Sequence, residues 1–171
     1  MMAFNEENYR KGPMRTFVFA IIVYLVCQMS YGANTNRVDV SKIEALNVIS
    51  KTLYHEARGE SEIGIKAVAS TIHNRAMKKS GNSSSNALVY EALRRKQYSC
   101  WNGRKDLPSG SGKEWMICRA IAYQMVIGEF KPTITNTHYY AHGKVNPKWA
   151  QEVEESDKLI LGNHTFLTVK W

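Results

Sequence analysis

The chain is poor in cysteine and lacks the short motifs that mark several common classes of protein. Its 171 residues contain three cysteines, Cys27, Cys100 and Cys118, whose odd number and wide spacing do not fit a zinc ribbon. No glycine-rich phosphate loop, zinc-finger spacing, RNP-like motif, internal repeat or low-complexity tract occurs. The net charge of +8 favours an anionic partner. Without a recognition motif, however, nucleic acid has little support, and we expect none to be bound.

Charge is also missing from one long stretch near the N-terminus. No Asp, Glu, Lys or Arg lies between Arg15 and Arg37, and this stretch starts with the apolar run of residues 16–27 and continues with small residues. A positive flank, an apolar run and small residues are typical of a signal peptide. The run is somewhat shorter than the ~20 residues that a membrane-spanning helix needs. We therefore expect a cleaved signal peptide, or a signal anchor that stays in the inner membrane through residues 16–33.

These features divide the chain into three parts. We expect residues 1–33 to be the signal peptide or signal anchor, 34–40 a linker and 41–171 one globular domain. A hydrophobic content of 44% is enough for that domain to bury a core. Cys100 and Cys118 could pair if the chain is exported, although two reduced cysteines are the simpler expectation.

The globular domain is expected to be mainly α (α+β), a helical domain with a small β-hairpin or sheet. Apolar residues at spacings of three and four predict amphipathic helices, and "KLILGNHTFLTVKW" predicts a terminal hairpin that turns at Gly162-Asn163. The segment from Thr137 to Trp149 fits a loop or a strand. Capping boxes and glycines place the helix ends: a first helix from the box at Ser41 to Gly59, a second ending at Gly81, a short third within 87–96, and a fourth from the box at Ser111 to Gly128.

Glu56 is the first candidate for chemistry. It follows Leu53 by three residues, so its side chain leans toward the apolar face of the first helix. A partly buried carboxylic acid has a raised pKa, and cleavage of a glycosidic bond needs such an acid beside the leaving oxygen. The alternative is a structural glutamate at a helix end, either solvated or paired with Arg58 or Arg75.

A second carboxylate is harder to find. Hydrolytic glycosidases usually need one, but Glu60 and Glu62 both fit better in the first turn of the second helix, where negative charge suits the helix dipole. A lone acid such as Glu56 can suffice if a hydroxyl of the sugar itself attacks the anomeric carbon.

Other chemistries have less support. "HEARG" lacks the second histidine of a zinc-protease helix, and His138 and His142 lie four apart in a segment that is not predicted to be helical. We expect no metal and no cofactor. A thiol protease pair of Cys100 and His138 has no local motif behind it.

Aromatic residues gather in "THYYAHGKVNPKW", Thr137 to Trp149, and Trp101 stands alone in "SCWNG". Flat aromatic faces with polar tips suit the pyranose rings and hydroxyls of a sugar. The same residues could instead cover the core.

Several of these segments occur in an order typical of one family. "YHEARGES", "AVASTIHNR", "QYSCWNG", "THYYAHGKVNPKWA" and "LGNHTF" follow one another from about Ser41 to Phe166. Together they resemble the SleB/CwlJ-type cell-wall hydrolases, which include spore cortex-lytic enzymes and relatives in bacteria and phages.

The resemblance implies a lysozyme-like fold and cleavage of the MurNAc-GlcNAc bond of peptidoglycan. In the family this is typically a lytic transglycosylase reaction that leaves 1,6-anhydro-muramyl ends, and the family's catalytic glutamate corresponds to Glu56. We expect no separate peptidoglycan-binding domain of the kind that the spore enzymes have. We expect the following residues around the cleft as substrate-binding groups: Arg58, Asn74, Trp101, His138, Tyr139, Tyr140 and Trp149.

We therefore expect a monomeric, exported enzyme of the periplasm or cell wall that acts on peptidoglycan strands. The compact, export-competent chain favours a phage lysin. Two alternatives stay open: a hydrolytic muramidase on the same fold, helped by Glu60 or Glu62, and a non-catalytic membrane-anchored protein that binds peptidoglycan.

Overall fold

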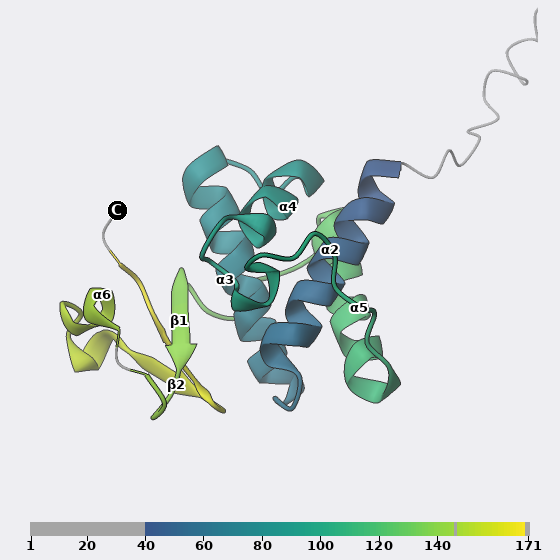
Figure 1. Ribbon diagram of the computed structural model, residues 1–171. Coiled ribbons are helices and arrows are strands. Elements are labelled where there is room, and N and C mark those ends of the chain that lie inside the picture. The colour runs from purple at the N-terminus through teal and green to yellow at the C-terminus, as the bar shows by residue number, and fades with distance from the viewer. Residues whose placement is uncertain (1–39, 146, 170–171) are drawn as a thin grey trace, which may run out of the picture. The chain divides into compact units, whose positions relative to one another are not determined.

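The computed structural model describes residues 40–145 and 147–169 (Figure 1). The expected signal or anchor segment, residues 1–33, and Cys27 within it lie outside these residues, as does all of the expected linker except Val40. Of the helices described, none is both long enough and apolar enough to cross a membrane.

The α2 helix is the central element of the domain. It spans Val40–Ala57 and packs against α3 (Glu62–Ser80), α4 (Ser85–Leu93) and α5 (Gly112–Ile127). Figure 1 shows α3 and α4 on one side of α2 and α5 on the other. A side chain at the C-terminal end of α2 is therefore attached to a helix that three other helices hold in place.

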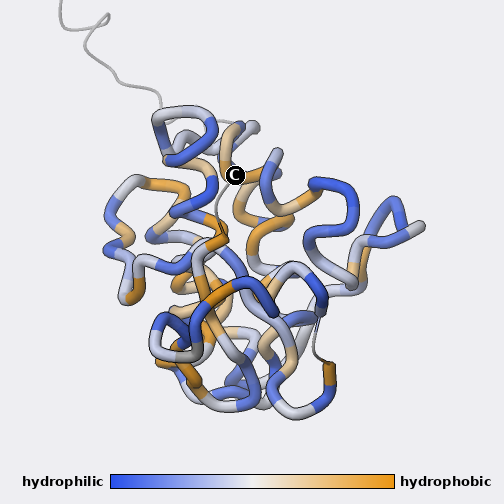
Figure 2. Tube along the Cα trace, turned by 90° about the vertical axis from the view of Figure 1, so that its left-hand side faces the viewer, coloured by the Kyte–Doolittle hydropathy of each residue, from blue (hydrophilic) through white to orange (hydrophobic). Residues whose placement is uncertain are grey.

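Most residues of the predicted apolar stripes lie in the core, but Ile43, at the start of the stripe predicted for the first helix, is 45% exposed, and Leu46 is only partly buried. Four residues of α2 recur at intervals of four and are all but inaccessible to solvent, namely Ala45, Ile49, Leu53 and Ala57. They meet the equally buried stripe of α3, which includes Ile65, Val68 and Ile72. Burying each of the larger side chains contributes about 1.5–3 kcal/mol. The tube in Figure 2 shows hydrophobic and hydrophilic residues alternating along the helices, as expected for elements with one buried face.

The predicted helix ends are mostly confirmed. Gly81 and Gly128 end α3 and α5 with left-handed backbone angles, φ 68° and 80°. Ser111 is the N-cap of α5, although its side chain makes no capping hydrogen bond. The prediction for Ser41 is wrong, because α2 already includes Val40 and Ser41 lies inside the helix.

The C-terminal part forms a three-stranded antiparallel sheet. Its strands are β1 (His138–Ala141), β2 (Leu159–Leu161) and β3 (His164–Leu167), in the order β1-β3-β2. The predicted hairpin is confirmed, because Leu161 pairs with His164 across Gly162-Asn163. The segment that fitted a loop or a strand forms β1 and then α6 (Lys148–Gln151). Two short 3-10 helices complete the described elements, η1 (Ser99–Trp101) and η2 (Glu155–Asp157).

The two faces of the sheet have different neighbours. Tyr139 on β1 pairs with Phe166 on β3, and Phe166 belongs to the same buried cluster as the helices. On the opposite face His138 and Tyr140 contact the ring of Trp149 from α6. The coarse prediction of a helical domain with a small sheet is confirmed, and the sheet presents Tyr139 toward the helices.

Candidate active site

Glu56 lies in the last turn of α2 and is half-buried. Its Oε1 accepts hydrogen bonds from the Cys100 backbone N–H at 2.9 Å and the Ser99 hydroxyl at 3.2 Å. Its Oε2 accepts a hydrogen bond from the Tyr139 hydroxyl at 3.0 Å. The carboxylate is therefore held at both oxygens, by groups from η1 and β1, and the pairing with Arg58 or Arg75 that the sequence left open is not what holds it.

The η1 turn is fixed to α2 independently of Glu56. The Trp101 indole Nε1 donates to Thr52 Oγ1 at 2.8 Å, and both side chains are buried. Because Thr52 lies one turn before Glu56, this bond sets the position of the Ser99 and Cys100 donors. Trp101 is thus a residue of the core that supports the site from behind.

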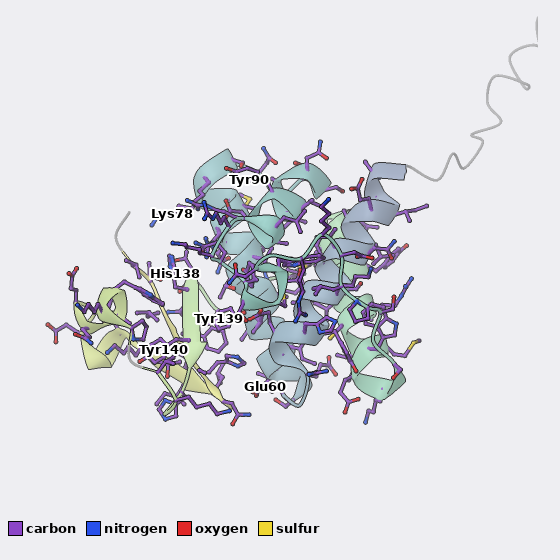
Figure 3. All side chains as sticks on the ribbon, viewed as in Figure 1. Glu60, Lys78, Tyr90, His138, Tyr139 and Tyr140 are labelled. Carbon is purple, nitrogen blue, oxygen red and sulfur yellow. The ribbon has the colours of Figure 1, made fainter. Side chains whose placement is uncertain are left out.

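Tyr139 stays protonated under ordinary conditions. Burial raises the pKa of its hydroxyl well above the usual range, and the negative charge of Glu56 raises it further. The ring packs at 5.0 Å from His164 and at 5.6 Å from Phe166, measured between ring centroids. Tyr139 is therefore a rigid donor aimed at Glu56, and Figure 3 shows it on the side of β1 that faces the helices.

We expected Glu60 in the first turn of α3, but this expectation is wrong. The helix begins at Glu62 after the N-cap Ser61, so Glu60 lies before it. Its side chain is 5% exposed, and His164 Nδ1 lies 3.4 Å from its Oε1. Its Oε1 also accepts from the Asn163 side-chain amide at 2.9 Å, and the Asn163 backbone N–H approaches both oxygens. The β2–β3 turn thus encloses this carboxylate. The same expectation for Glu62 is confirmed, since it lies in the first turn of α3 and pairs with Lys66.

The two glutamates share a neighbour in His164. Burial lowers the pKa of its imidazole, and the carboxylates of Glu60 and Glu56 act in the opposite direction. The contact with Glu60 therefore joins a carboxylate to a neutral ring at neutral pH. A chain of contacts runs from Glu56 through Tyr139 and His164 to Glu60.

A pocket of about 210 Å³ lies beside Tyr139. Two of the predicted substrate-binding residues, His138 and Trp149, line it together with Tyr139. Trp149 is 41% exposed. Tyr140 contacts Trp149 but lines a separate hollow together with His142.

Two further predicted residues lie elsewhere. The Asn74 side-chain amide donates to the backbone carbonyls of Ile134 and Asn136 at 2.8 and 2.9 Å, and so fixes the segment that leads into β1. Arg58 is exposed, with its guanidinium carbon 6.0 Å from the ring centroid of Tyr54. In these contacts Asn74 supports the site from behind and Arg58 lies outside the hydrogen-bonding shell of Glu56.

Cys100 and Cys118 are both free thiols, as the simpler expectation had it. Burial raises the pKa of the Cys100 thiol, and the nearby Glu56 carboxylate raises it further. A thiol held in its neutral form is a poor nucleophile, so the Cys100 and His138 pair has no chemical basis. Within 40–145 and 147–169, no three side chains of His, Cys, Asp or Glu gather as a metal site would require.

The structural roles of some residues around the site could not be inferred from the sequence. Tyr98 is buried against Tyr139, with ring centroids 6.2 Å apart, and burial raises its pKa to about 12. Arg75 and Glu91 form a buried ion pair at 3.1 Å. Glu91 could have been noticed as a charge among the buried Ala87, Leu88 and Ala92 of α4. Tyr98 stands in the segment "QYSCWNG", but nothing in that segment indicates that its ring is buried.

Comparison with known proteins gives one match. The family model described as Cell Wall Hydrolase matches residues 59–167, more than half of the chain. The matched range includes Glu60, Tyr139 and Trp149, and it begins three residues after Glu56. No curated protein and no solved structure matches the chain significantly.

Proposed function

Because this chain belongs to the cell wall hydrolase family, whose members degrade peptidoglycan, we propose that it cleaves the MurNAc-GlcNAc β-1,4 glycosidic bond with Glu56 as its single acid and base. The observation that carries the proposal is the half-buried carboxylate of Glu56, held at both oxygens by donors from η1 and β1. Such fixation keeps an acid in one orientation toward a glycosidic oxygen. The resemblance of "YHEARGES" to the family's catalytic motif supports the same residue.

The reaction would be that of a lytic transglycosylase. Glu56 protonates the glycosidic oxygen as the bond from the muramyl C1 breaks. The Glu56 carboxylate then takes the proton of the muramyl 6-hydroxyl as that oxygen bonds to C1. The products are a free 4-hydroxyl and a 1,6-anhydro-muramyl end, and Glu56 is protonated again.

The surroundings of Glu60 support a mechanism with one acid. A hydrolytic muramidase uses a second carboxylate to activate water or to attack the sugar. The side chain of Glu60 is 5% exposed and its oxygens are engaged by Asn163 and His164. Glu62 is occupied by Lys66 at 2.6 Å in the next helix.

A hydrolytic muramidase is the second candidate, because one observation favours it. The negative charges of Glu56 and Glu60 both act to raise the pKa of His164. The two carboxylates therefore both lie near this one residue, and Glu60 is near Glu56. If the β2–β3 turn opened on substrate binding, Glu60 could act on a water molecule. The chemical form of the product separates the two candidates.

The wider assignment follows from the same proposal. The fold is lysozyme-like, with the acid at the end of a helix that faces a small sheet. Residues 1–33 direct export as a signal peptide or signal anchor, 34–40 link them to the catalytic domain 41–171, and the enzyme works as a monomer in the periplasm or cell wall. We also propose that the protein is a phage lysin, a role supported by the export-type pattern of residues 16–33.

The test is solubilisation of dye-labelled peptidoglycan sacculi by the full-length protein and by Glu56→Gln. The amide fills the same space but cannot donate a proton as an acid, so the variant should lose activity and keep its melting temperature. Glu129→Gln is the matched control, because Glu129 is exposed after α5, and it should remain active. An active Glu56→Gln protein would reject Glu56 as the acid. Sacculi that bind the wild-type protein without dissolving would favour the non-catalytic alternative.

A further inference from the structure

Glu60 carries a carboxylate that the proposed reaction does not use. It lies in the turn between α2 and α3, and its side chain is 5% exposed. A Cβ added at Gly64 in α3 would lie 3.0 Å from the Cβ of Glu60, and one added at Gly162 in the β2–β3 turn would collide with its Oε2. The side chain therefore fills the space between α3 and the turn. Enclosing a carboxylate costs free energy unless its oxygens accept hydrogen bonds, so filling space does not by itself account for a glutamate here.

The oxygens of Glu60 are bonded to the β2–β3 turn. Oε1 accepts a hydrogen bond from the side-chain amide of Asn163 at 2.9 Å and another from its backbone N–H at 3.2 Å, while Oε2 lies 3.3 Å from the same N–H. Asn163 is the residue directly before β3. The contact therefore fixes where β3 begins relative to the connection between α2 and α3.

The first residue of β3 transmits this constraint to Tyr139. His164 Nδ1 lies 3.4 Å from Glu60 Oε1 and makes no hydrogen bond within residues 40–145 and 147–169. A carboxylate that faces Nδ1 favours the tautomer with its proton on that atom. The imidazole packs against the ring of Tyr139 at 87°, with the centroids 5.0 Å apart. Rings in such close contact restrict each other's position.

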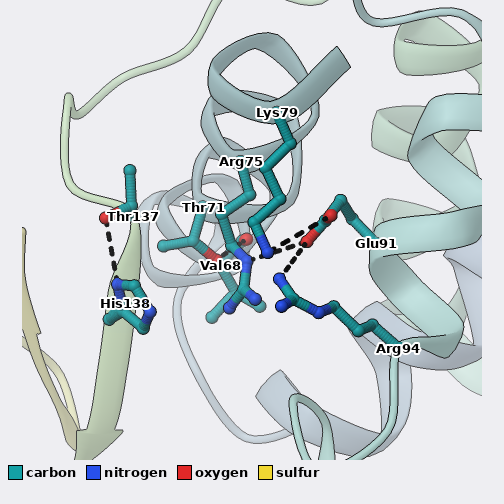
Figure 4. Close-up of polar contacts among 8 residues, drawn as sticks. All are labelled: Val68, Thr71, Arg75, Lys79, Glu91, Arg94, Thr137 and His138. Atoms are coloured by element: carbon teal, nitrogen blue, oxygen red, sulfur yellow. Dashed lines mark hydrogen bonds and ion pairs between the residues drawn. The ribbon is translucent and has the colours of Figure 1, made fainter. Parts of the chain in front are cut away.

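The strand that carries Tyr139 is fixed separately. Asn74 of α3 donates to two backbone carbonyls before β1, and Thr137 Oγ1 lies 3.0 Å from His138 Nδ1 at the start of the strand (Figure 4). Side chains alternate between the faces of a strand, so Tyr139 points to the opposite face from His138. The orientation of its ring therefore depends on the side chains packed against it, including that of His164.

We propose that Glu60 is a positioning residue for the acid: it holds the β2–β3 turn and the His164 ring, and through them the hydrogen bond from Tyr139 to Glu56. That bond is 3.0 Å long and reaches Oε2 of Glu56. The inference rests on the proposed function, because it assigns Glu60 a role only if Glu56 is the acid. Glu60 itself touches no reacting atom and exchanges no proton with the substrate.

The experiment is a double-mutant cycle in the full-length protein. Glu60→Gln keeps the shape of the side chain and one acceptor oxygen but removes the charge, and Tyr139→Phe removes the donor to Glu56. Initial rates on soluble peptidoglycan fragments give kcat and KM for the wild type, both single variants and the double variant. Glu129→Gln, exposed after α5, controls for the loss of one negative charge, and melting temperatures verify that each variant folds.

We expect Glu60→Gln to lower kcat about fivefold and to leave KM nearly unchanged, because the acid is less well oriented while the contacts with substrate stay. In the Tyr139→Phe protein the same substitution should lower kcat less than about twofold, since the hydrogen bond through which Glu60 acts is already gone. A residue that only stabilised the fold would give no such dependence. Glu129→Gln should equal the wild type.

Asn163→Ala tests the same contact from the side of the turn and serves if Glu60→Gln does not fold. Asn163 is exposed and does not have a positive φ, so alanine fits its backbone. The variant loses the side-chain donor to Glu60 and keeps the backbone donor. We expect a loss of about threefold in kcat, which also disappears in the Tyr139→Phe protein.

Three results would overturn the inference. The first is an equal loss of kcat from Glu60→Gln with and without the Tyr139 hydroxyl, which would mean that Glu60 acts by another route. The second is wild-type kcat in both Glu60→Gln and Asn163→Ala. The third is reducing ends from the wild type together with an inactive, folded Glu60→Gln protein, which would make Glu60 a catalytic carboxylate. An active Glu56→Gln protein would instead contradict the proposed function on which the inference rests.

Discussion

At the scale of single residues, the proposed reaction depends on the hydrogen bonds that hold Glu56 in one orientation. Tyr139 donates to Oε2 at 3.0 Å, while Ser99 and Cys100 donate to Oε1. A hydrogen bond to a charged group is worth about 1.5–3 kcal/mol. Since the ring of Tyr139 packs between His164 and Phe166, removing its hydroxyl alone would free one carboxylate oxygen without opening a cavity of any size.

We therefore predict that Tyr139→Phe lowers kcat about tenfold or more and changes KM little, because orientation of the acid is lost while the pocket keeps its ring. Steady-state kinetics on soluble muropeptides gives the two constants. Tyr123→Phe, on the exposed side of α5, is the control. Wild-type kcat in Tyr139→Phe would show that this hydrogen bond has no part in the reaction.

Glu56 could be found from the sequence, and Tyr139 was expected near the cleft, but the hydrogen bonds that hold Glu56 could not be predicted. Its own spacing from Leu53 and the motif around it are local features. Its donors lie 43, 44 and 83 residues further along the chain, so only the folded chain brings them together. The position of Trp101 also depends on the fold. From the sequence it could be a sugar platform or a core residue, and in the structure its indole is buried and bonded to Thr52.

At the scale of elements, the β2–β3 hairpin is joined to the turn between α2 and α3 through Glu60. Gly162 in the hairpin has a φ of 56°, and a Cβ at this position would collide with Glu60 Oε2. Gly143, in the turn after β1, has a similar φ of 68° but nothing within 4 Å of its Cβ position. Substitutions at the two glycines therefore separate the free-energy cost of backbone strain from the cost of the collision with Glu60.

We predict that Gly162→Ala destabilises the protein by about 1–2 kcal/mol more than Gly143→Ala, because Glu60 must move aside and give up hydrogen bonds from Asn163, in addition to the backbone strain that both variants share. Urea unfolding of the two variants measures the difference. Equal free energies of unfolding would mean that Glu60 moves aside at no cost, and that its contacts with Asn163 and His164 are weak.

The hairpin itself was predictable because its turn chemistry is local. Gly162-Asn163 between two apolar runs is enough to specify two short antiparallel strands. The position of Glu60 was not predictable, since a glutamate just before a helix fits the helix dipole equally well. Its actual partner, Asn163, is 103 residues away.

At the scale of the whole molecule, two histidines, the half-buried His138 and the buried His164, make stability depend on pH. Burial lowers the pKa of His138 to about 4 and also lowers the pKa of His164. An unfolded histidine has a pKa of about 6.5. Between these values the unfolded chain binds more protons than the folded one, so stability rises with pH and is lost as pH falls below about 6.5.

We predict a melting temperature that is steady near pH 7 and falls between about pH 6.5 and pH 5, above the range in which most carboxylates titrate. His138→Gln should flatten part of this fall, because the glutamine takes up no proton. Scanning calorimetry of both proteins across this range measures it. Parallel curves for wild type and His138→Gln would exclude His138 as a source of the dependence.

The general architecture followed from the sequence for a physical reason. Apolar residues at helical spacing specify most of the buried faces of α2 and α3. In α2 the predicted Ile49, Leu53 and Ala57 lie in the core, whereas the predicted Ile43 is exposed. The cluster of Arg75, Lys79, Arg94 and Glu91 did not follow from the sequence. Charges on separate helices carry no periodic signal, and their meeting depends on how α3 and α4 pack.

Mass spectrometry of the products of purified peptidoglycan tests the central claim most directly, with full-length wild type and Glu56→Gln compared side by side. The account predicts 1,6-anhydro-muramyl ends, each one water lighter than a reducing end, from the wild type and no soluble products from Glu56→Gln. Reducing ends from the wild type would contradict the transglycosylase mechanism and turn attention to Glu60. Products from Glu56→Gln would contradict the assignment of the acid itself.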